Sequence, residues 1–402
     1  MNREDFEIFK DGLIYLDNAA TTMKPNVVVN SVVNSVVDYY TKYTANAHRG
    51  DYDNSLKVDN EYEGAREKVR KFINADSVNE VIFTKGSTES FNMIVFGFMS
   101  GFLKKDDEVI LNKGEHASNI LPWLALSKKI GFKIKYAKLN DNYELSVESI
   151  ENEITPKTKV ISLAHITNAI GDIRDIEKVG NICKEKDILF VLDATQSIGH
   201  IKMDVKKYNV SFMGFSAHKM LGPTGVGVLY GKEELLERLV PMEYGGGMNI
   251  AFSSDGEYTL KELPFRLEAG TRNIAGVIGL GSAIDYLENI GMDKIHDYER
   301  ELKKYLISRM EEVPNIKIYN KNVESGVLLF NVGKYFSQDV AIYLNQFKIC
   351  IRAGNHCAKM LEEVICDTNT CRASLYFYNT KHDIDVLVDA LKDQDKILDT
   401  LV

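Results

Sequence analysis

Lys219 is the residue of this 402-residue chain whose surroundings most favour covalent chemistry. It follows His218 and precedes a turn that contains Gly222, Gly225 and Gly227. A lysine amine attacks a carbonyl only when it is deprotonated and held in place, and nearby glycines let a flat ring lie close to the backbone. The pattern predicts that Lys219 anchors pyridoxal phosphate through the cofactor's aldehyde. A solvated lysine before a turn has a similar local sequence, so the prediction depends on partners elsewhere in the chain.

Polar residues that suit such a cofactor follow several predicted strands. Asp193 comes directly after an apolar run, and its carboxylate can keep a pyridine nitrogen protonated. His116 can stack on a ring or move a proton, and the segment 85–90 predicts a helix N-terminus that binds phosphate. Taken alone, each residue could equally cap a turn or helix. The residues that together indicate one site are Thr88, His116, Asn168, Asp193, Gln196, Ser216, His218 and Lys219.

A wound α/β domain would bring these residues together. β-Like runs at 80–84, 108–112, 159–164, 188–192, 211–215 and 226–230 alternate with amphipathic segments such as 176–184. Ligands of such sheets bind outside the carboxyl ends of the strands, which is where the polar residues fall. The segment 27–40 is rich in valine, but its apolar residues recur at three- and four-residue steps, which predicts a helix.

The sequence pattern changes after about residue 286. A charged amphipathic helix at 294–312 is followed by β-like runs at 316–319, 327–332, 349–353 and 374–378. We therefore expect a large domain at 16–286 and a smaller α/β domain composed of 1–15 and 287–402. The glycine-rich segment 244–248 predicts a loop close to a site.

Composition and charge limit the classes of partner. With 45% hydrophobic residues the chain can form a large core, and its net charge of -9, without a dense Lys/Arg run, argues against nucleic acid and anionic membrane surfaces. We find no signal-peptide core and no apolar run of bilayer length. The five irregularly spaced cysteines do not indicate a disulfide framework, so we expect a cytoplasmic protein with free thiols.

Ordered motifs extend over nearly the whole chain. In sequence order they are YLDNAATT (15–22), HRG (48–50), GSTESFN (86–92), EHASNILPW (115–123), AHITNAIG (164–171), DATQ (193–196), FSAHKMLGPTGVGVLY (215–230), EAGTRN (268–273), RAGNHCA (352–358) and CRASLYFYNT (371–380). This set resembles the group II cysteine desulfurases of the class V aminotransferase family. The resemblance implies the α/β fold of the fold type I pyridoxal-phosphate transferases, with a mostly parallel seven-stranded sheet and a smaller C-terminal domain. It also implies release of sulfur from L-cysteine, with L-alanine as the other product.

The resemblance assigns roles around the cofactor ring. Lys219 matches the Schiff-base lysine and Asp193 the partner of the pyridinium nitrogen. His116 matches the residue that stacks on the ring, while Gln196 and Asn168 match positions near the ring hydroxyl and the substrate.

Further roles concern the phosphate and the substrate carboxylate. Thr88, Ser216 and His218 match phosphate ligands, and Thr271 matches a hydroxyl that the other subunit of a homodimer contributes. Arg372 matches the clamp for the substrate carboxylate, a task that suits a planar guanidinium.

Cys357 determines the chemistry that the resemblance implies. Its neighbours Arg352 and His356 favour the thiolate form, although a small buried structural cysteine is the usual alternative. In the implied reaction Lys219 removes the Cα proton and Cys357 attacks the substrate sulfur. Cys357 then carries a persulfide that a sulfur-acceptor protein of a SUF-type iron-sulfur assembly system takes over.

Two positions depart from the pattern of the group. Asn355 precedes His356, where members often have a second histidine, and Ala117 follows His116, where some relatives have one. These substitutions concern the position of the cysteine loop and the choice of acceptor.

Other functions are compatible with the same scaffold. They are a selenocysteine lyase acting on L-selenocysteine, a cysteine sulfoxide lyase, another class V aminotransferase, and a non-catalytic docking scaffold. The last needs neither Lys219 nor Cys357, so the presence of both argues against it. Cys366 and Cys371 do not form a paired CxxC pattern with the other candidate ligands, so no metal site is expected.

Overall fold

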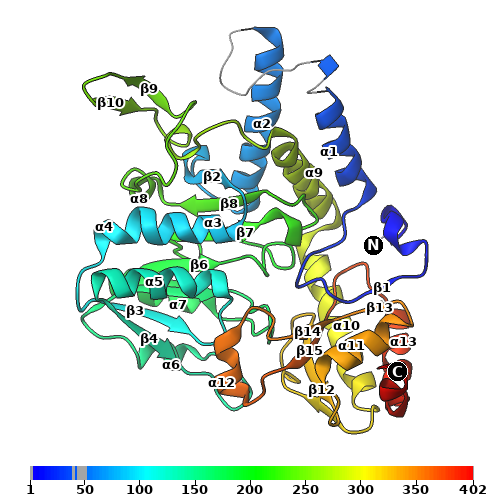
Figure 1. Cartoon of the computed structure of the whole chain (residues 1–402). Helices are drawn as coiled ribbons and strands as arrows, with labels where there is room; N and C mark the ends of the chain where they lie inside the picture. Colours follow the sequence, from blue (N-terminus) through cyan, green and yellow to red (C-terminus); the bar gives the residue numbers. More distant parts are fainter. Residues whose placement is uncertain (1–2, 39–40, 43–51, 402) are drawn as a thin grey trace.

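A large mixed sheet forms the centre of the computed structural model, which describes residues 3–38, 41–42 and 52–401 (Figure 1). Its strand order is β2-β8-β7-β6-β5-β3-β4. Strand β8 is antiparallel to both of its neighbours, and the other adjacent pairs are parallel. The predicted fold class, with a mostly parallel seven-stranded sheet, is therefore confirmed. The strands are β2 Val81–Thr84, β3 Glu108–Asn112, β4 Lys133–Ala137, β5 Thr158–Ala164, β6 Leu189–Asp193, β7 Phe212–Ser216 and β8 Gly227–Gly231.

The six strands predicted for this sheet are confirmed to within one residue at each end, but β4 was not predicted. Strand β4 lies at the edge of the sheet and pairs with β3 alone. Its sequence, KIKYA, has lysines at alternate positions and no continuous apolar run. An edge strand needs less apolar surface than a central strand, which explains the missing signal.

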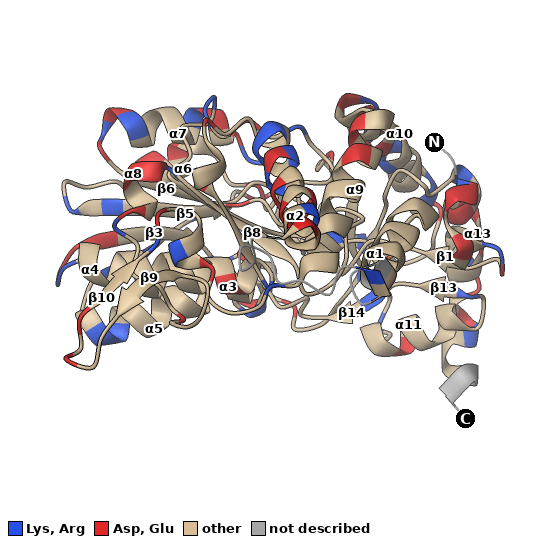
Figure 2. Ribbon diagram, turned by 90° about the horizontal axis from the view of Figure 1, so that it is seen from above, with Lys and Arg blue, Asp and Glu red and all other residues tan. Residues whose placement is uncertain are grey.

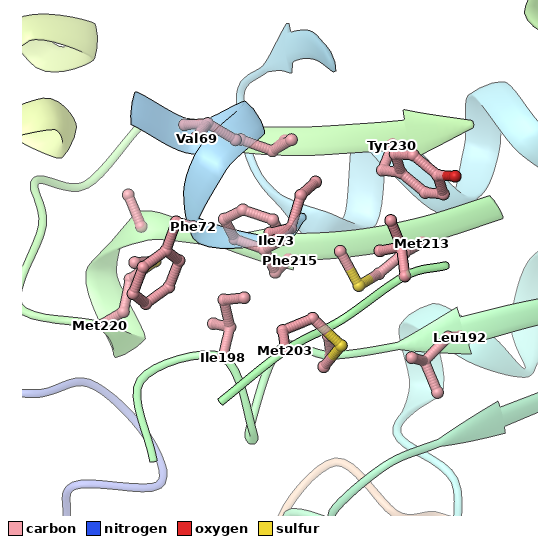
Figure 3. Packing of buried hydrophobic residues seen from close by; sticks show 14 of the residues in the cluster. Val69, Phe72, Ile73, Leu192, Ile198, Met203, Met213, Phe215, Met220 and Tyr230 are labelled. Atoms are coloured by element: carbon pink, nitrogen blue, oxygen red, sulfur yellow. The ribbon is translucent and has the colours of Figure 1, made fainter. Parts of the chain in front are cut away.

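Two apolar layers cover the two faces of this sheet. Successive side chains on a strand point to opposite faces, so Val228 and Tyr230 of β8 pack on one side and Leu229 on the other. Figure 3 shows the first layer, where Phe215 of β7 lies among residues from the end of helix α2 (Asp53–Phe72) and from neighbouring strands. Helices α2, α7 (Ile176–Glu185) and α9 (Ile274–Ile290) contribute to this layer. Helix α5 (Leu121–Ile130) and the π-helical segment η5 (Met93–Met99) contribute to the other.

The helices of this part of the chain follow the predicted alternation with strands. The predicted helix at 176–184 is confirmed as α7, and that at 27–40 is confirmed as α1 over its described residues, because residues 39–40 lie outside the described chain. The HRG motif at 48–50 also lies outside it. The helices are α1 Asn26–Asp38, α2 Asp53–Phe72, α3 Ser87–Asn92, η5 Met93–Met99, α4 Ser100–Phe102, α5 Leu121–Ile130, α6 Val147–Glu151, α7 Ile176–Glu185, α8 Glu233–Leu236 and α9 Ile274–Ile290.

A second, antiparallel sheet forms in the C-terminal part of the chain. Its order is β11-β12-β15-β14, and α10 and α13 pack against each other beside it. A further parallel pair joins β1 near the N-terminus to β13. The elements are β1 Ile14–Tyr15, α10 Met292–Met310, β11 Ile316–Ile318, β12 Val327–Val332, α11 Ser337–Asn345, β13 Ile349–Cys350, β14 Arg352–Gly354, α12 Glu362–Ile365, β15 Thr370–Ser374 and α13 Lys381–Lys392.

One strand prediction in this region is wrong. The run 374–378 is not a strand, because β15 ends at Ser374 and the chain then turns. The aromatic residues that follow are buried by packing between the two sheets, and the hydroxyl of Tyr376 donates to the carbonyl of Gly199 at 2.8 Å. Aromatic residues are common in strands, so this buried aromatic run has the composition of a strand without being one.

The predicted domain division at residue 286 falls inside α9, which continues to Ile290 before α10 begins. The division into 16–286 and 1–15 with 287–402 therefore stays a prediction. Strands β9 Asn249–Phe252 and β10 Tyr258–Leu260 form a hairpin that projects from the body of the molecule (Figure 1). It follows the glycine-rich segment 244–248.

Charged side chains of both signs are interspersed on the outer helices, for example on α2 and α7 (Figure 2). In the ranges that the structure describes, no helix combines the length and apolar character needed to cross a bilayer.

Candidate functional site

A cavity of about 190 Å³ opens at the carboxyl ends of the parallel strands. Both sheets contribute to its wall, because β15 of the second sheet supplies Arg372. The structure thus brings together nine of the residues predicted from the sequence. They are Thr88, His116, Asn168, Asp193, Gln196, Ser216, His218, Lys219 and Arg372.

Lys219 ends a single 3-10 turn, Ala217–Lys219, that directly follows β7. Burial lowers the pKa of its amine to about 8, and the positive charge of Arg372 acts in the same direction. Asp193 opposes this effect. About a tenth of the amine is therefore neutral at pH 7, the form that nucleophilic attack on a carbonyl requires.

Asp193 is the last residue of β6 and is buried. Its Oδ1 accepts a hydrogen bond from the backbone N–H of Thr195 at 2.9 Å. Burial raises the pKa of the carboxyl group, while the hydrogen bonds from Thr195 and the charges of Lys219 and Arg174 oppose this rise. A buried carboxylate in this position can hold a protonated heterocyclic nitrogen.

His116 lies in the loop after β3 with its ring at the cavity. Its Nδ1 accepts a hydrogen bond from the backbone N–H of Ser118 at 3.1 Å, which leaves any proton of the neutral ring on Nε2. Burial, and then the charge of Lys219, lowers the pKa of His116 to about 4. The ring is therefore neutral near pH 7 and suited to stacking on another ring.

One end of the cavity is rich in hydroxyl and amide groups. The N–H of Ser87, at the start of α3, donates to Ser216 Oγ at 2.8 Å, and Thr88 Oγ1 lies 2.7 Å from Ser118 Oγ. A Cβ at Gly86, where φ is +156°, would lie 3.3 Å from Ser216 Oγ, so glycine permits this close approach. These groups suit a phosphate.

His218 adjoins the same end of the cavity. Its Nδ1 lies 3.1 Å from Thr21 Oγ1, and Lys24 Nζ donates to the His218 carbonyl at 2.8 Å. Burial, followed by the charges of Lys219 and Lys24, lowers the pKa of His218 to about 4. Neutral His218 can thus donate one ring N–H to an anion. The YLDNAATT motif contains Thr21, but no sequence pattern indicates that Thr21 lies beside His218.

Several buried polar atoms of the cavity residues lack a hydrogen-bond partner among the described residues. They include Asn168 Oδ1, Gln196 Oε1, His356 Nδ1 and Arg372 Nε. Because an unsatisfied buried polar group is costly, these atoms are expected to contact a polar ligand or water. Together with the amine of Lys219 and the carboxylate of Asp193, they fit the functional groups of pyridoxal phosphate.

Arg372 is fixed by two neighbours. Its Nη2 lies 2.7 Å from Asp17 Oδ1, and its Nη1 donates to the carbonyl of Asn168 at 2.9 Å. Its Nε is buried without a partner among the described residues. Sequence reasoning did not single out Asp17, although the residue lies in the quoted YLDNAATT motif.

Cys357 is exposed and does not line the cavity, whereas the preceding His356 does. Arg352 Nη2 lies 3.5 Å from Cys357 Sγ. Burial, and then the charges of Arg372 and Arg352, lowers the pKa of His356 to about 3, so this ring is neutral. Of the two neighbours expected to favour a thiolate, only Arg352 therefore supplies positive charge.

Of the two departures from the group pattern, Asn355 lies on the loop that carries Cys357, and Ala117 contacts this loop from the segment after β3. Asn355 Oδ1 accepts a hydrogen bond from the Cys357 N–H at 3.2 Å, and the Ala117 N–H donates to the Cys357 carbonyl at 2.8 Å. Asn168 Nδ2 donates to the His356 carbonyl at 2.6 Å. The loop is thus connected to the large sheet on both sides of the cavity.

Thr271 is not brought to this cavity. It lines a separate cavity of about 380 Å³ together with Lys85, Arg272 and other residues. Within a single chain, Thr271 and Lys219 therefore belong to different cavities. Among the described residues, no group of three or more His, Cys, Asp or Glu side chains is arranged to hold a metal ion.

Comparison with known proteins identifies the family. The Aminotransferase class-V family matches residues 14–387, and the chain belongs to this family. Its relatives include a probable cysteine desulfurase of Halalkalibacterium halodurans, which is 40% identical over 96% of this chain and 94% of the relative. A probable cysteine desulfurase of Synechocystis is 38% identical over 97% and 94% of the two chains.

Solved structures agree in fold. The apo structure of a cysteine desulfurase from Thermococcus onnurineus has a TM-score of 0.92 and 36% identity, and covers 98% of this chain and 97% of the other. The cysteine desulfurase CsdA from Escherichia coli, in an S-sulfonic acid form, has a TM-score of 0.90 and 34% identity, with 100% and 98% coverage.

Proposed function

We propose that this protein is a pyridoxal-phosphate-dependent cysteine desulfurase. It converts L-cysteine to L-alanine and carries the sulfur as a persulfide on Cys357, from which an acceptor protein takes it for iron-sulfur cluster assembly. The observation that carries the proposal is the convergence of Lys219, Asp193, His116 and Arg372 on one cavity, with the exposed Cys357 next to a cavity residue. The relatives named as cysteine desulfurases support the same activity.

Three residues would hold the cofactor ring. Pyridoxal phosphate supplies an aldehyde for covalent attachment and a ring that withdraws electrons from the substrate. Lys219 would anchor the cofactor through its aldehyde, Asp193 would hold the ring nitrogen protonated, and His116 would support the ring. The lowered pKa of Lys219 also lets the released amine accept the Cα proton of the substrate.

The remaining cavity residues would orient the cofactor and the substrate. Thr88, Ser216 and His218 surround the end that suits a phosphate. The buried oxygens of Gln196 and Asn168, which lack partners among the described residues, would contact the cofactor and the substrate. Arg372 binds the substrate carboxylate.

Cys357 performs the sulfur transfer. Its thiolate forms an S–S bond with the substrate sulfur as the C–S bond of the substrate breaks; protonation of that carbon and return of a proton from Lys219 to Cα then give alanine. Arg352, whose Nη2 is 3.5 Å from Cys357 Sγ, stabilises the negative charge on sulfur. The exposed position of Cys357 then allows an acceptor to reach the persulfide.

We also propose that the active form is a homodimer in the cytoplasm. Thr271, which lies in a separate cavity, would reach the phosphate bound by the partner subunit. Helix α1 exposes Val29, Val33 and Val37, and the β9–β10 hairpin exposes Phe252, which supplies apolar surface for such an association. The free state of all five cysteines supports a reducing compartment.

The test is incubation of the cofactor-loaded protein with L-cysteine and a reductant, followed by measurement of alanine and sulfide. Cys357→Ala should keep the yellow colour of the bound cofactor but lose sulfide release. Cys366→Ala is the matched control, because Cys366 is also exposed, and it should retain activity. A yellow wild-type protein that releases neither product would refute the desulfurase function. Unchanged sulfide release by Cys357→Ala would refute the nucleophile, and faster turnover of L-selenocysteine than of L-cysteine would favour a selenocysteine lyase.

A further inference from the structure

Asp17 forms an ion pair with Arg372, which lines the cavity. Its Oδ1 lies 2.7 Å from Nη2 of Arg372, whose side chain is only 1% exposed. Burial lowers the pKa of Arg372, and the Asp17 carboxylate opposes this effect. Because the guanidinium is removed from water, its alignment depends on the groups that contact it.

The backbone around Asp17 is held against β15, the strand that carries Arg372. The Ser374 N–H donates to the Leu16 carbonyl at 2.6 Å, and the Ala19 N–H donates to Ser374 Oγ at 2.9 Å. Asp17 itself forms a β-bridge with Ser374. Since these hydrogen bonds hold the segment around Asp17 against β15, the Asp17 carboxylate can act as a rigid support for the Arg372 guanidinium.

The contacts of Arg372 leave one of its donors, the Nε–H, without an acceptor among the described residues. Nη2 is held by Asp17 and Nη1 by the carbonyl of Asn168, whereas Nε is buried without a partner among the described residues. An arginine binds a carboxylate best through two parallel N–H groups, and Nε–H with an adjacent Nη–H forms such a pair.

The Asp17 carboxylate also offsets the repulsion between Arg372 and Arg352. Arg352 and Arg372 are directly opposite each other on β14 and β15, so two like charges face each other at the cavity wall. Like charges in this arrangement repel, and this repulsion would displace the Arg372 guanidinium unless another group holds it. The Asp17 carboxylate supplies the compensating attraction.

We propose that Asp17 is a positioning residue that orients Arg372 for the α-carboxylate of the amino-acid substrate. The inference rests on the proposed function, in which Arg372 binds that carboxylate. Asp17 therefore sets the preference of the site for an amino acid over the corresponding amine.

The test compares two ligands that differ only in the carboxylate, L-cysteine and cysteamine. Binding to the cofactor-loaded protein is followed by visible absorbance in a Cys357→Ala background, which prevents sulfur transfer. In Asp17→Asn the side-chain oxygen is retained but the charge is removed. We expect binding of L-cysteine to weaken about tenfold, equal to about 1.4 kcal/mol, with cysteamine affinity unchanged. Asp11→Asn is the control for an exposed N-terminal aspartate and should alter neither ligand.

Equal weakening of both ligands by Asp17→Asn would show a general structural role and overturn the inference, as would unchanged or tighter binding of L-cysteine. Asp17→Ser is measured in parallel, so that the conclusion does not depend on the folding of one variant. Arg372→Gln separates this inference from the proposed function. If Arg372→Gln abolishes the preference for L-cysteine while the Asp17 variants keep it, the clamp stands and the role of Asp17 fails. If Arg372→Gln keeps the preference, the clamp itself is refuted.

Discussion

The pKa of Lys219 predicts the pH at which the cofactor-free protein captures pyridoxal phosphate. Only the neutral amine attacks the aldehyde. With a pKa of about 8, Lys219 is roughly 10% neutral at pH 7, compared with about 0.03% for a lysine at its ordinary value of 10.5. The neutral fraction is thus about 300-fold larger than that of a solvated lysine. The rate of capture should rise with pH and level off above about pH 8.

The assay removes the cofactor, mixes the protein with pyridoxal phosphate between pH 6 and about pH 11, and follows the appearance of the bound chromophore. Pyridoxine phosphate, which lacks the aldehyde, is the control for the pH dependence of noncovalent binding. The positive charge of Arg352 lowers the pKa of Lys219, so Arg352→Gln should move the midpoint to higher pH. A capture rate that still rises through pH 10, as expected for an ordinary lysine, would refute the argument. A midpoint that moves to lower pH in Arg352→Gln would refute its electrostatic part.

Three further predictions concern stability and the cysteine loop. Glu268→Gln should lower the free energy of unfolding by about 1–3 kcal/mol in urea denaturation, because it removes one of the two carboxylates that pair with the buried Arg66 guanidinium and leaves only Glu63; a loss below about 0.5 kcal/mol would contradict this. Burial lowers the pKa of Lys303 to about 7. Between pH 7 and 10.5 the unfolded state therefore binds one proton more than the folded state, and the free energy of unfolding should increase with pH. Lys303→Met should abolish this increase and raise the free energy of unfolding by on the order of 1–3 kcal/mol at pH 7. Asn168→Ala removes the donor to the His356 carbonyl and should speed alkylation of Cys357 by iodoacetamide; an unchanged rate would show that this hydrogen bond does not restrain the loop.

Much of the large sheet could be predicted because its central strands are buried on both faces. Such strands appear in the sequence as short continuous apolar runs, as in the Phe212–Ser216 strand. The edge strand Lys133–Ala137 lacked this signal, and the aromatic run at 374–378 imitated it. In both cases the position of a segment in the tertiary structure, rather than its local pattern, determined the outcome.

The candidate site was predictable to the extent that its residues follow strands. Thr88, His116 and Asp193 occur at strand ends, and the topology of a parallel sheet brings such ends to one edge. Asp17 had no comparable signal. Its partner Arg372 is 355 positions away in the sequence, and only the packing of the N-terminal segment on β15 places the two side chains together.

The different exposures of Lys219 and Cys357 follow from their different tasks. Lys219 needs a site with little water, because burial is the main cause of its lowered pKa. In the proposed function Cys357 must contact the substrate sulfur and afterwards an acceptor, which a fully buried thiol could not do. Cys357 lies one residue beyond His356, which lines the cavity, and Ala117 and Asn168 hold the backbone of this loop. In this proposal sulfur leaves from an exposed thiol, whereas the proton transfer takes place at Lys219 in the cavity.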